Sequence, residues 1–511
     1  MKAKDIFPVQ DMLFAGDGDI EISGISYDTR KLQKGDAFFA LPGHMTDGKN
    51  FIREAAEKGA SVIISQEKAD NVVLPQIIVK NIFSFMSEFS AKFYNYPDRE
   101  MTIIGITGTN GKTTITYMIE SILAHCGISC GVIGTVNYRY GGKVFNAPNT
   151  TPQSADIYKM MREMCSCAIR YLVMEVSSHA LALGRVAGID FDIAVFTNLT
   201  RDHLDFHKDI ESYFAAKSLL FSELGKGIKS NIKYAIINAD DKYGKKLFKI
   251  DINAKKKSYG VKTNEVDFKA ANINVSSVGS EFNVIAANAM AERVKIKHIG
   301  LHNIYNVLSS IAACVACGID FKRVVEALNG CTQAPGRLER VNTKNLGFEI
   351  VVDYAHTDDA LKNVLSALND LKPKRIITLF GCGGDRDRTK RPLMGKIAVE
   401  MSDFVFVTSD NPRTEDPLQI ILDIEVGIKR IGKTNYKIIA DREHAIKEAV
   451  MMAKKGDIIL LAGKGHETYQ ITGTQKIPFN DIEFAQKYLD LKEKQKASLK
   501  SWQTQQKEFD F

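Results

Sequence analysis

Hydrophobic residues in this chain occur mostly in short unbroken runs, and many of these runs end at glycines or polar clusters. From about residue 99 onward the runs do not alternate, and stretches with helical spacing separate them. Such runs are typical of parallel strands that helices cover on both faces. In sheets of this kind the ligand binds outside the carboxyl ends of the strands. The pattern therefore predicts an α/β fold with sites where polar clusters follow the strands.

The runs fall into three groups, and a chain of 511 residues is long enough for three domains. Residues 1–98 predict a small α/β domain, in which the polar cluster at 26–30 is either a ligand site or a turn. Residues 99–333 and 334–490 each repeat an apolar strand with a polar end, which predicts two doubly wound domains. Residues 491–511 are charged and polar, and we expect a solvated helix or a disordered tail there.

The most specific local motif is the glycine-rich stretch at 103–114, between an apolar run and a helical pattern. Glycines let backbone N–H groups face an anion, the helix N-terminus adds partial positive charge, and Lys112 adds a full charge. Thr113 is placed to bring a hydroxyl to Mg²⁺. Gly105 and Gly108 depart from the common P-loop spacing. We predict a nucleoside triphosphate site, with a plain glycine turn as the alternative.

Composition changes this picture little. Hydrophobic residues make up 45% and charged residues 25%, which is ordinary for a soluble globular protein. The net charge of +7 suits anionic small substrates and, without a basic block, argues against a nucleic-acid partner. Neither a signal peptide nor a membrane span is evident, so a cytoplasmic location is expected. The eight cysteines indicate reduced thiols, and for the CxxC of Cys314 and Cys317 we favour packing over a metal or redox role.

Two polar residues that follow predicted strands could serve a metal ion. Glu175 ends the run at 171–176, and His203 follows the run at 191–198. Taken singly, each could be a structural hydrogen-bonding group, but beside a P-loop threonine they favour Mg²⁺. Lys217 lies in an otherwise apolar helical stretch, as either a surface lysine or a buried one with a depressed pKa.

Taken together, the polar motifs resemble those of the Mur ligases, the ATP-dependent amide-forming enzymes of peptidoglycan precursor synthesis. In chain order they are GTNGKTT (108–114), NTTP (149–152), MEVSSHAL (174–181), TNLTRDHLDFH (197–207), AAK (215–217), LHNIYN (301–306), PGRLE (335–339), DYAH (353–356) and GKGHE (463–467). The resemblance covers nearly the whole chain except the tail. It is strongest to the members that add the third residue to UDP-N-acetylmuramoyl-L-alanyl-D-glutamate, because NTTP precedes VSSH and FGCGGDRDRTKRPLMG follows (380–395). Asp358 and Leu183 depart from the family pattern, which usually has proline and sometimes glutamine there.

The resemblance implies a UDP-binding N-terminal domain, a central ATPase and a C-terminal Rossmann-like domain. A monomer is also expected. The resemblance also implies that the γ-phosphoryl of ATP moves to the D-glutamyl side-chain carboxylate, and that an amine then attacks the acyl phosphate. The implied ATP contacts are Gly108, Thr109, Asn110, Gly111, Lys112, Thr113, Thr114, Asn303, Arg337 and Asp353. Two Mg²⁺ ions would be served by Thr113, Glu175, His203 and a carbamylated Lys217, which with Lys112 form the implied catalytic set. The UDP-sugar peptide would be held by Thr29, Asn149, Thr150, Thr151, Ser177 and Arg185.

The incoming amino acid is implied by the DNPR motif, which in the family marks enzymes that use meso-diaminopimelate. A guanidinium fork suits the extra carboxylate that distinguishes this diamino acid from lysine. The implied contacts are Arg386, Asp410, Asn411, Pro412 and Arg413 at one end, and Gly463 and Glu467 at the other. L-Lysine and meso-lanthionine stay open as alternatives. Folylpolyglutamate synthases share the phosphate loop but not DNPR, and a nucleotide-binding protein without ligase activity is the alternative from another class.

Overall fold

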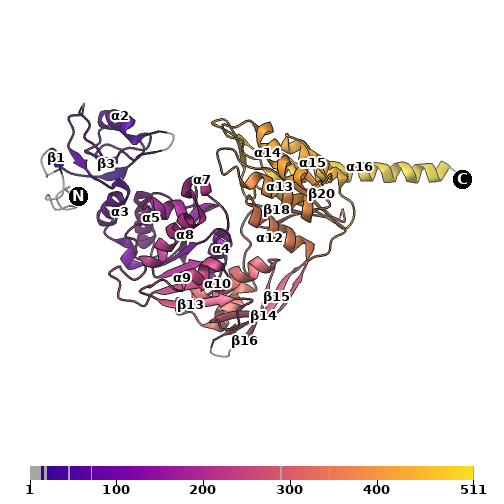
Figure 1. Ribbon diagram of the computed structural model, residues 1–511, viewed down its shortest axis with the longest axis horizontal. Coiled ribbons are helices and arrows are strands. Elements are labelled where there is room, and N and C mark those ends of the chain that lie inside the picture. The colour runs from indigo at the N-terminus through magenta and orange to yellow at the C-terminus, as the bar shows by residue number, and fades with distance from the viewer. Residues whose placement is uncertain are drawn as a thin grey trace.

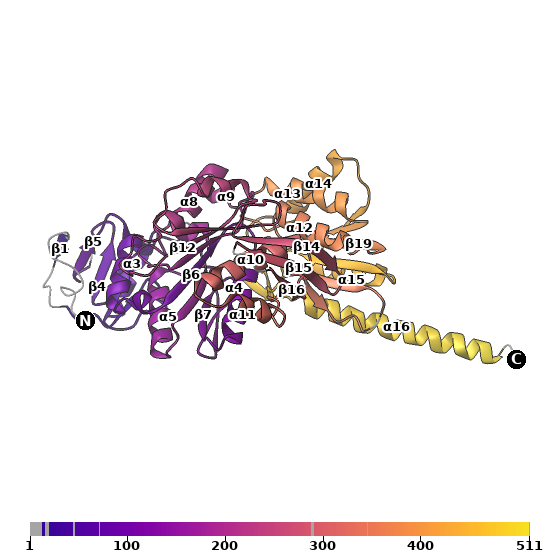
Figure 2. The same cartoon turned by 90° about the horizontal axis from the view of Figure 1, so that it is seen from below.

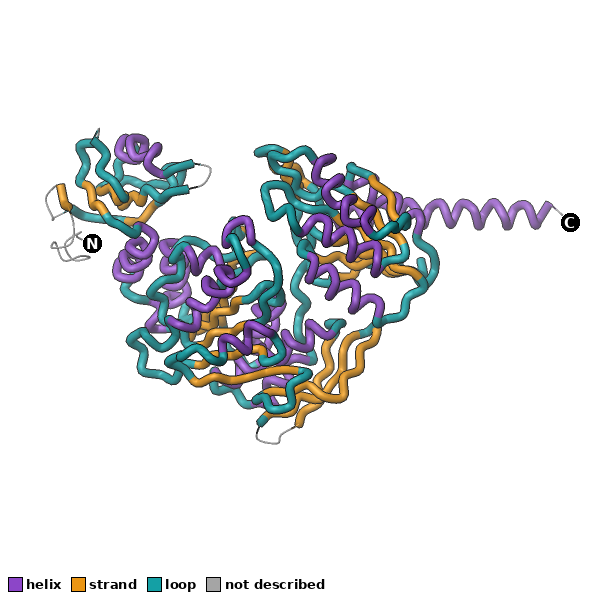
Figure 3. Tube along the Cα trace, in the orientation of Figure 1, coloured by secondary structure: helices purple, strands orange, loops and turns teal. Residues whose placement is uncertain are grey.

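The computed structural model describes residues 13–15, 20–43, 46–70, 72–287, 291–344 and 346–509. Three β-sheets with their own helices follow one another along the chain (Figure 1), and a two-stranded sheet accompanies the last of them. The strands of the central and C-terminal sheets lie between helices (Figure 3), which confirms the expected α/β fold. The first sheet lies at one end of the molecule and the C-terminal sheet at the other, and the central sheet lies between them (Figure 1). The domain limits expected after residues 98, 333 and 490 stay predictions.

The first sheet is small and largely parallel, in the order β1-β5-β4-β3-β2 with β1 antiparallel to β5. Its strands are β1 (Leu13–Ala15), β2 (Gly24–Ser26), β3 (Asp36–Phe39), β4 (Val62–Ser65) and β5 (Gln76–Ile78). The helical segments are η2 (Gly48–Phe51), α2 (Ile52–Glu57) and α3 (Ile82–Phe93). Helix α3 contributes Met86 and Phe89 to the core, where the Phe89 ring meets that of Phe39 edge-on.

The central sheet has eleven strands in the order β16-β15-β14-β13-β12-β11-β6-β10-β7-β8-β9. The strands are β6 (Thr102–Thr107), β7 (Cys130–Ile133), β8 (Asn137–Tyr140), β9 (Lys143–Asn146), β10 (Tyr171–Glu175), β11 (Ile193–Phe196), β12 (Tyr234–Asn238), β13 (Lys255–Gly260), β14 (Phe268–Ser276), β15 (Gly279–Ala286) and β16 (Ala291–Ile296). Pairing is parallel from β7 to β14, as the unalternated runs predict, and antiparallel at both edges.

Helices cover both faces of this sheet, so residues of its central strand enter two separate cores. On β6, Ile103 packs into one core, whereas Ile104 and Ile106 pack into the other with α4 and α10. The second core also contains Cys314, in agreement with the packing interpretation of the CxxC sequence. The helical segments are η3 (Pro97–Glu100), α4 (Lys112–His125), α5 (Ser154–Ser166), α6 (Ser178–Ala182), α7 (Leu204–His207), α8 (Ile210–Ser222), α9 (Lys242–Leu247), α10 (Leu301–Ala316) and α11 (Phe321–Leu328).

The C-terminal sheet is parallel except for β17, in the order β17-β18-β22-β19-β20-β21. Its strands are β17 (Glu339–Val341), β18 (Glu349–Asp353), β19 (Arg375–Phe380), β20 (Phe404–Val407), β21 (Tyr436–Ile438) and β22 (Asp457–Ala462), followed by a hairpin of β23 (Tyr469–Thr472) and β24 (Gln475–Pro478). The helices are α12 (Asp358–Asn369), α13 (Lys390–Met401), α14 (Pro417–Arg430), α15 (Arg442–Met452) and α16 (Asp481–Phe509).

Helix α16 begins in the core and ends away from the rest of the molecule (Figure 2). The buried pair of Arg442 and Asp481 fixes its first turn, with nitrogen and oxygen 2.7 Å apart. Ala485 and Leu489 then pack into the core beside α15. The helix passes residue 490 without a break, so the expected tail is helical as far as residue 509. None of the helices in the described ranges combines the length and apolar character that a membrane span requires.

Candidate functional site

The glycine-rich loop joins β6 to α4, as the sequence predicts. Gly108 and Gly111 have φ angles of +146° and +94°, in a region that favours glycine. A Cβ atom at Gly108 would lie 1.8 Å from the Thr197 side-chain oxygen, so no larger residue fits. The Lys112 ammonium folds back over the loop and donates to the carbonyls of Gly108 (2.9 Å) and Thr109 (2.8 Å). Loop and lysine together provide a positively charged cradle for phosphate.

Thr113 and Glu175 lie next to each other at the start of α4. The threonine hydroxyl donates to Glu175 Oε1 over 2.9 Å, and the Thr135 backbone N–H donates to the same oxygen over 2.8 Å. The Glu175 side chain is buried, yet within the described part of the chain it forms no ion pair. Arg337 reaches this point from the C-terminal side, where its Nη2 donates to the Thr113 hydroxyl over 3.2 Å. A buried carboxylate that accepts from a hydroxyl and forms no ion pair with a described residue fits a hard divalent ion such as Mg²⁺.

Lys217 is buried on α8 with 1% of its surface exposed, so the surface-lysine alternative is wrong. Its nitrogen donates to the Gly108 carbonyl over 2.9 Å and lies 4.6 Å from the centre of the Tyr213 ring. Burial holds the pKa of this amine well below its ordinary value, and the charge of Lys112 lowers it further. A neutral amine is nucleophilic, so Lys217 is chemically able to take up CO₂ as a carbamate.

His203 stands at the N-terminus of α7 with a left-handed backbone (φ +55°). Its Nε2 lies 3.3 Å from an oxygen of Asp202, and its ring meets the ring of His179 edge-on. Burial lowers the pKa of the imidazole to about 3, so His203 is neutral near pH 7 and keeps a lone pair for a metal ion.

Two cavities adjoin these groups. The first, of about 340 Å³, is lined by the predicted ATP residues Asn110, Gly111, Thr114, Asn303, Arg337 and Asp353. The second, of about 410 Å³, is lined by His203 and by predicted substrate residues from both the central and C-terminal parts of the chain, namely Asn149, Thr150, Thr151, Ser177, Arg185, Arg386, Asp410, Asn411, Arg413, Gly463 and Glu467. Segments far apart in sequence therefore meet in one substrate-sized space.

Two predicted substrate residues lie outside this second cavity. Pro412 does not line it, and its carbonyl instead packs against Gly384. Thr29 is buried in the first domain, next to a separate cavity lined by Ser26 and Asp28 of the polar cluster. That cavity lies between the first sheet and helix α5, which favours a ligand site over a plain turn for residues 26–30.

Sequence reasoning missed several residues that line the second cavity. They are Thr135, His179, Asp202, Asp205, Tyr354, His356, Asp387, Lys390, His466 and Tyr469. Most of them stand inside motifs already singled out, next to a predicted residue. Their place in these polar motifs is the sequence feature by which they could have been predicted.

Arg413 and its neighbours form the C-terminal wall of this cavity. Arg413 has a left-handed backbone (φ +52°), and its Nη1 donates to the Gly384 carbonyl over 2.6 Å. Asn411 donates from its side-chain amide to Glu467 over 2.9 Å. The buried Lys464 ammonium donates to both Asn411 (3.2 Å) and Glu467 (3.0 Å). The side chains expected at the two ends of the amino acid are thus joined in one network.

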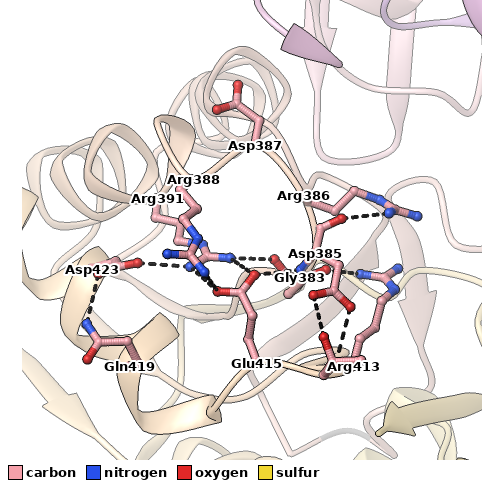
Figure 4. Close-up of polar contacts among 12 residues, drawn as sticks. Gly383, Asp385, Arg386, Asp387, Arg388, Arg391, Arg413, Glu415, Gln419 and Asp423 are labelled. Carbon is pink, nitrogen blue, oxygen red and sulfur yellow. Dashed lines mark hydrogen bonds and ion pairs between the residues drawn. The ribbon is translucent and has the colours of Figure 1, made fainter. Parts of the chain in front are cut away.

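Arg391 links the loop that carries Arg386 to the loop that carries Arg413 through Glu415 (Figure 4). Its side chain is fully buried and donates to Glu415 over 2.8 Å and 3.0 Å, and to Asp423 over 2.9 Å. Glu415 also accepts the Asp385 backbone N–H over 2.6 Å. Hydrogen bonding by Arg391 is the main cause that lowers the pKa of the Glu415 carboxyl to about 2. This network fixes the loop of Arg386 against the loop of Arg413.

Replacing Glu415 with glutamine should lower the free energy of unfolding by about 3 kcal/mol at pH 7, because Arg391 then stays buried with less negative charge around it. The difference from wild type should shrink as the pH falls toward about 2, where the wild-type carboxyl is also protonated. Urea titrations at several pH values measure this. The control is Glu400→Gln, which alters the exposed pair of Lys396 and Glu400 and should cost less than about 0.5 kcal/mol. Equal losses in the two variants would contradict the prediction.

Three family models of Mur ligases match successive parts of this chain. The Mur ligase family catalytic domain matches residues 21–95, the Mur ligase middle domain 106–314, and the Mur ligase glutamate ligase domain 336–465.

Individual relatives align over nearly the full length. The chain is 45% identical over 492 residues to UDP-N-acetylmuramoyl-L-alanyl-D-glutamate–2,6-diaminopimelate ligase 1 of Clostridium acetobutylicum, covering 96% of this chain and 99% of the relative. It is 44% identical to the corresponding ligase of Bacillus velezensis, covering 91% and 94%. A solved structure of a UDP-N-acetylmuramoyl-L-alanyl-D-glutamate–2,6-diaminopimelate ligase has a TM-score of 0.67 and 31% identity, covering 96% and 99%. A folylpolyglutamate synthase of Mycobacterium tuberculosis, at 16% identity and a TM-score of 0.59, shares the fold over 73% of this chain and 91% of its own. The chain belongs to the Mur ligase family.

Proposed function

We propose that this protein is an ATP-dependent ligase that joins meso-diaminopimelate to the D-glutamyl side-chain carboxylate of UDP-N-acetylmuramoyl-L-alanyl-D-glutamate. The observation that carries the proposal is the second cavity. Its lining includes the DNPR residues Asn411 and Arg413, the NTT residues of the central part and His203. The relatives that align over nearly the whole chain are named for this reaction.

ATP would occupy the first cavity, with its phosphates on the loop from Gly108 to Thr114. The D-glutamyl carboxylate attacks the γ-phosphorus, and the bond to the β-phosphate oxygen breaks with its electron pair to give ADP and an acyl phosphate. Lys112 and Arg337 are placed to offset negative charge near Thr113, where the phosphates would lie. Asp353, a predicted ATP contact, also accepts hydrogen bonds from the backbone N–H groups of Leu338 and Ala355.

Thr113, Glu175, His203 and a carbamylated Lys217 would hold the two Mg²⁺ ions, which supply positive charge to the phosphate oxygens when bound. The residues fit this role, because Glu175 is a buried carboxylate that forms no ion pair with a described residue and His203 is neutral. Carbamylation would convert Lys217 from an amine with one hydrogen bond into an anionic ligand at the same place.

In the second step the amine nitrogen attacks the acyl carbon, and the carbon–oxygen bond to phosphate breaks with its electron pair. The residues around the C-terminal wall would orient the amino acid for this attack, which is largely a matter of positioning. Closure between the central and C-terminal parts would exclude water from the acyl phosphate. Contacts across this boundary already exist, since Asp359 accepts from Asn110 over 2.9 Å and from Thr200 over 3.3 Å. We further propose a cytoplasmic monomer that acts on small molecules and binds no nucleic acid.

Substrate dependence tests the proposal directly. Purified protein with ATP and Mg²⁺ should release phosphate only when both the muramoyl dipeptide and meso-diaminopimelate are supplied. Mass spectrometry should find one tripeptide product for each phosphate released. ATP hydrolysis that ignores both substrates would instead favour a nucleotide-binding protein without ligase activity. Equal or better use of L-lysine or meso-lanthionine would change the amino acid but keep the reaction class.

A further inference from the structure

Lys390 is a buried lysine that lines the second cavity and has no hydrogen-bond or ion-pair partner among the described residues. It is the first residue of α13, directly after the loop that carries Arg386. Only 5% of its surface is exposed, and it lines the cavity together with Asp202, His203 and His356. Its ammonium makes no hydrogen bond or ion pair with any residue that the structure describes. Because burial of an ammonium without hydrogen bonds is costly, an anionic ligand that binds in the cavity would be favourable beside Lys390.

Lys390 lines the cavity together with residues of the central part of the chain. Asp202 and His203 line it as well, and His203 is a predicted ligand of the magnesium ions that would hold the phosphates. Burial and the charge of Lys390 lower the pKa of His356 to about 4, and Arg337 contributes to the same shift. His356 is therefore close to both Lys390 and Arg337, the cation that donates to the Thr113 hydroxyl beside the loop.

The position of Lys390 is fixed by the residue that follows it. Arg391 is fully buried and bonded to two carboxylates, those of Glu415 and Asp423. The first turn of α13 is thereby anchored, and the adjacent side chain enters the cavity from a rigid element. Asp387 also lines the cavity, and Figure 4 shows its carboxylate pointing away from the Arg391 network. Its Oδ2 is buried without a partner, yet Asp387 and Lys390 form no ion pair with each other.

We propose that Lys390 is a catalytic residue that binds the phosphoryl group as it passes from ATP to the carboxylate and leaves as phosphate. The proposal rests on the proposed function. In the first step a carboxylate oxygen bonds to the γ-phosphorus as the bond to ADP breaks. In the second step the amine nitrogen bonds to the acyl carbon, and phosphate departs with the electrons of the carbon–oxygen bond. In both steps the Lys390 side chain would offset charge on the phosphoryl oxygens.

Binding of the amino acid's carboxylate is the competing role for Lys390. That carboxylate already has two guanidinium groups on the C-terminal wall, Arg386 and Arg413, whereas Lys390 faces Asp202 and His356. A structural ion pair with Asp202 is the other competing role. It does not fit, because no oxygen of Asp202 lies within ion-pair distance of the Lys390 ammonium.

Two measurements on Lys390→Met separate these roles. The first is steady-state kinetics with each substrate varied in turn. The second is positional isotope exchange of the β,γ-bridging oxygen of ATP, with muramoyl dipeptide present and no amine, which reports acyl phosphate formation alone. We expect kcat and the exchange rate both to fall about 100-fold, with the KM for meso-diaminopimelate changed less than about threefold. Lys390→Arg should recover part of both rates, because it keeps the charge.

Lys396→Met on the exposed side of α13 is the matched control and should behave as wild type. ADP binding and thermal unfolding of each variant check folding, and Lys390→Gln replaces the methionine variant if that one does not fold. Normal exchange with a raised KM for the diamino acid would overturn the proposal in favour of amino-acid binding. Unchanged kinetics would overturn it outright. Absence of both exchange and ligation in the wild type would count against the proposed function instead, so the two failures are distinguishable.

Discussion

Replacing Lys217 with alanine should reduce amide-bond formation by about 10³-fold while ATP binding stays close to that of the wild type. The buried amine lies 2.9 Å from the Gly108 carbonyl, and burial lowers its pKa, so it is available to react with CO₂. The alanine variant loses the anionic ligand that a carbamate would provide beside Glu175 and His203. Phosphate release under saturating substrates measures the loss, and calorimetric titration with ADP measures nucleotide binding.

Chemical rescue and a conservative variant make this test specific. A small carboxylic acid such as acetate should restore part of the activity of Lys217→Ala, because it can take the place of the carbamate. Lys217→Arg keeps a cation but cannot form a carbamate, so it should be as inactive as the alanine variant. A carbon-13 resonance from labelled CO₂ should appear in the wild type alone. Full activity in either variant would refute the carbamate role.

The burial of Lys217 could not be predicted from the sequence, and the reason lies in helix α8. Apolar residues are spread around this helix instead of gathering on one face, so the pattern does not say which side is buried. Tyr213 and Phe221 belong to the core and Leu219 is 40% exposed, although all three look alike in the sequence. Only the packing of α8 beneath the glycine-rich loop places Lys217 at Gly108.

The sequence pattern predicted only some of the strands of the central sheet. Most of the parallel strands were predictable because they are continuous apolar runs buried on both faces. Strand β13 was not predictable, because it begins with three lysines and is only partly buried. Strands β14 to β16 were not, since they alternate apolar and polar residues and resemble surface segments. In β16, Val294 and Ile296 are buried, whereas Lys295 is exposed and Glu292 is half-buried. Their antiparallel pairing depends on neighbours that the local pattern does not reveal.

Lys390 was missed because the sequence around it is dense in charge. The stretch at 385–391 contains three arginines, two aspartates and a lysine within seven residues, a composition typical of solvated loops. Its burial follows from Arg391, whose carboxylate partners Glu415 and Asp423 lie 24 and 32 residues further along the chain. A local charge pattern carries no information about such distant partners. The motif order identified the site, but the tertiary contacts decide which of its charges are buried.

Arg413→Ala should lower kcat/KM for meso-diaminopimelate by about 10²–10³-fold, because the distal carboxylate loses a bidentate charged partner inside the cavity. The effect on L-lysine should be less than about tenfold, since lysine has no carboxylate to pair with the guanidinium. In the structure Arg413 is held in a left-handed backbone conformation and bonded to Gly384, so it is already oriented before the amino acid arrives. Competition between the two amino acids, with tripeptide products separated by mass, measures both values in one reaction.

Two further variants show whether geometry or charge accounts for this preference. Arg413→Lys keeps the charge but loses the planar fork, and it should recover only part of the lost activity. Arg388→Ala is the matched control, because Arg388 lies on the neighbouring loop and pairs with Glu415 at 2.9 Å but does not line the cavity. It should leave the ratio of the two products unchanged. If Arg413→Ala lowered the use of both amino acids equally, Arg413 would serve the fold of the loop and not recognition of the distal carboxylate. Because Asn411, Glu467 and Lys464 would remain bonded to one another in that variant, a selective loss would assign the preference to the guanidinium itself.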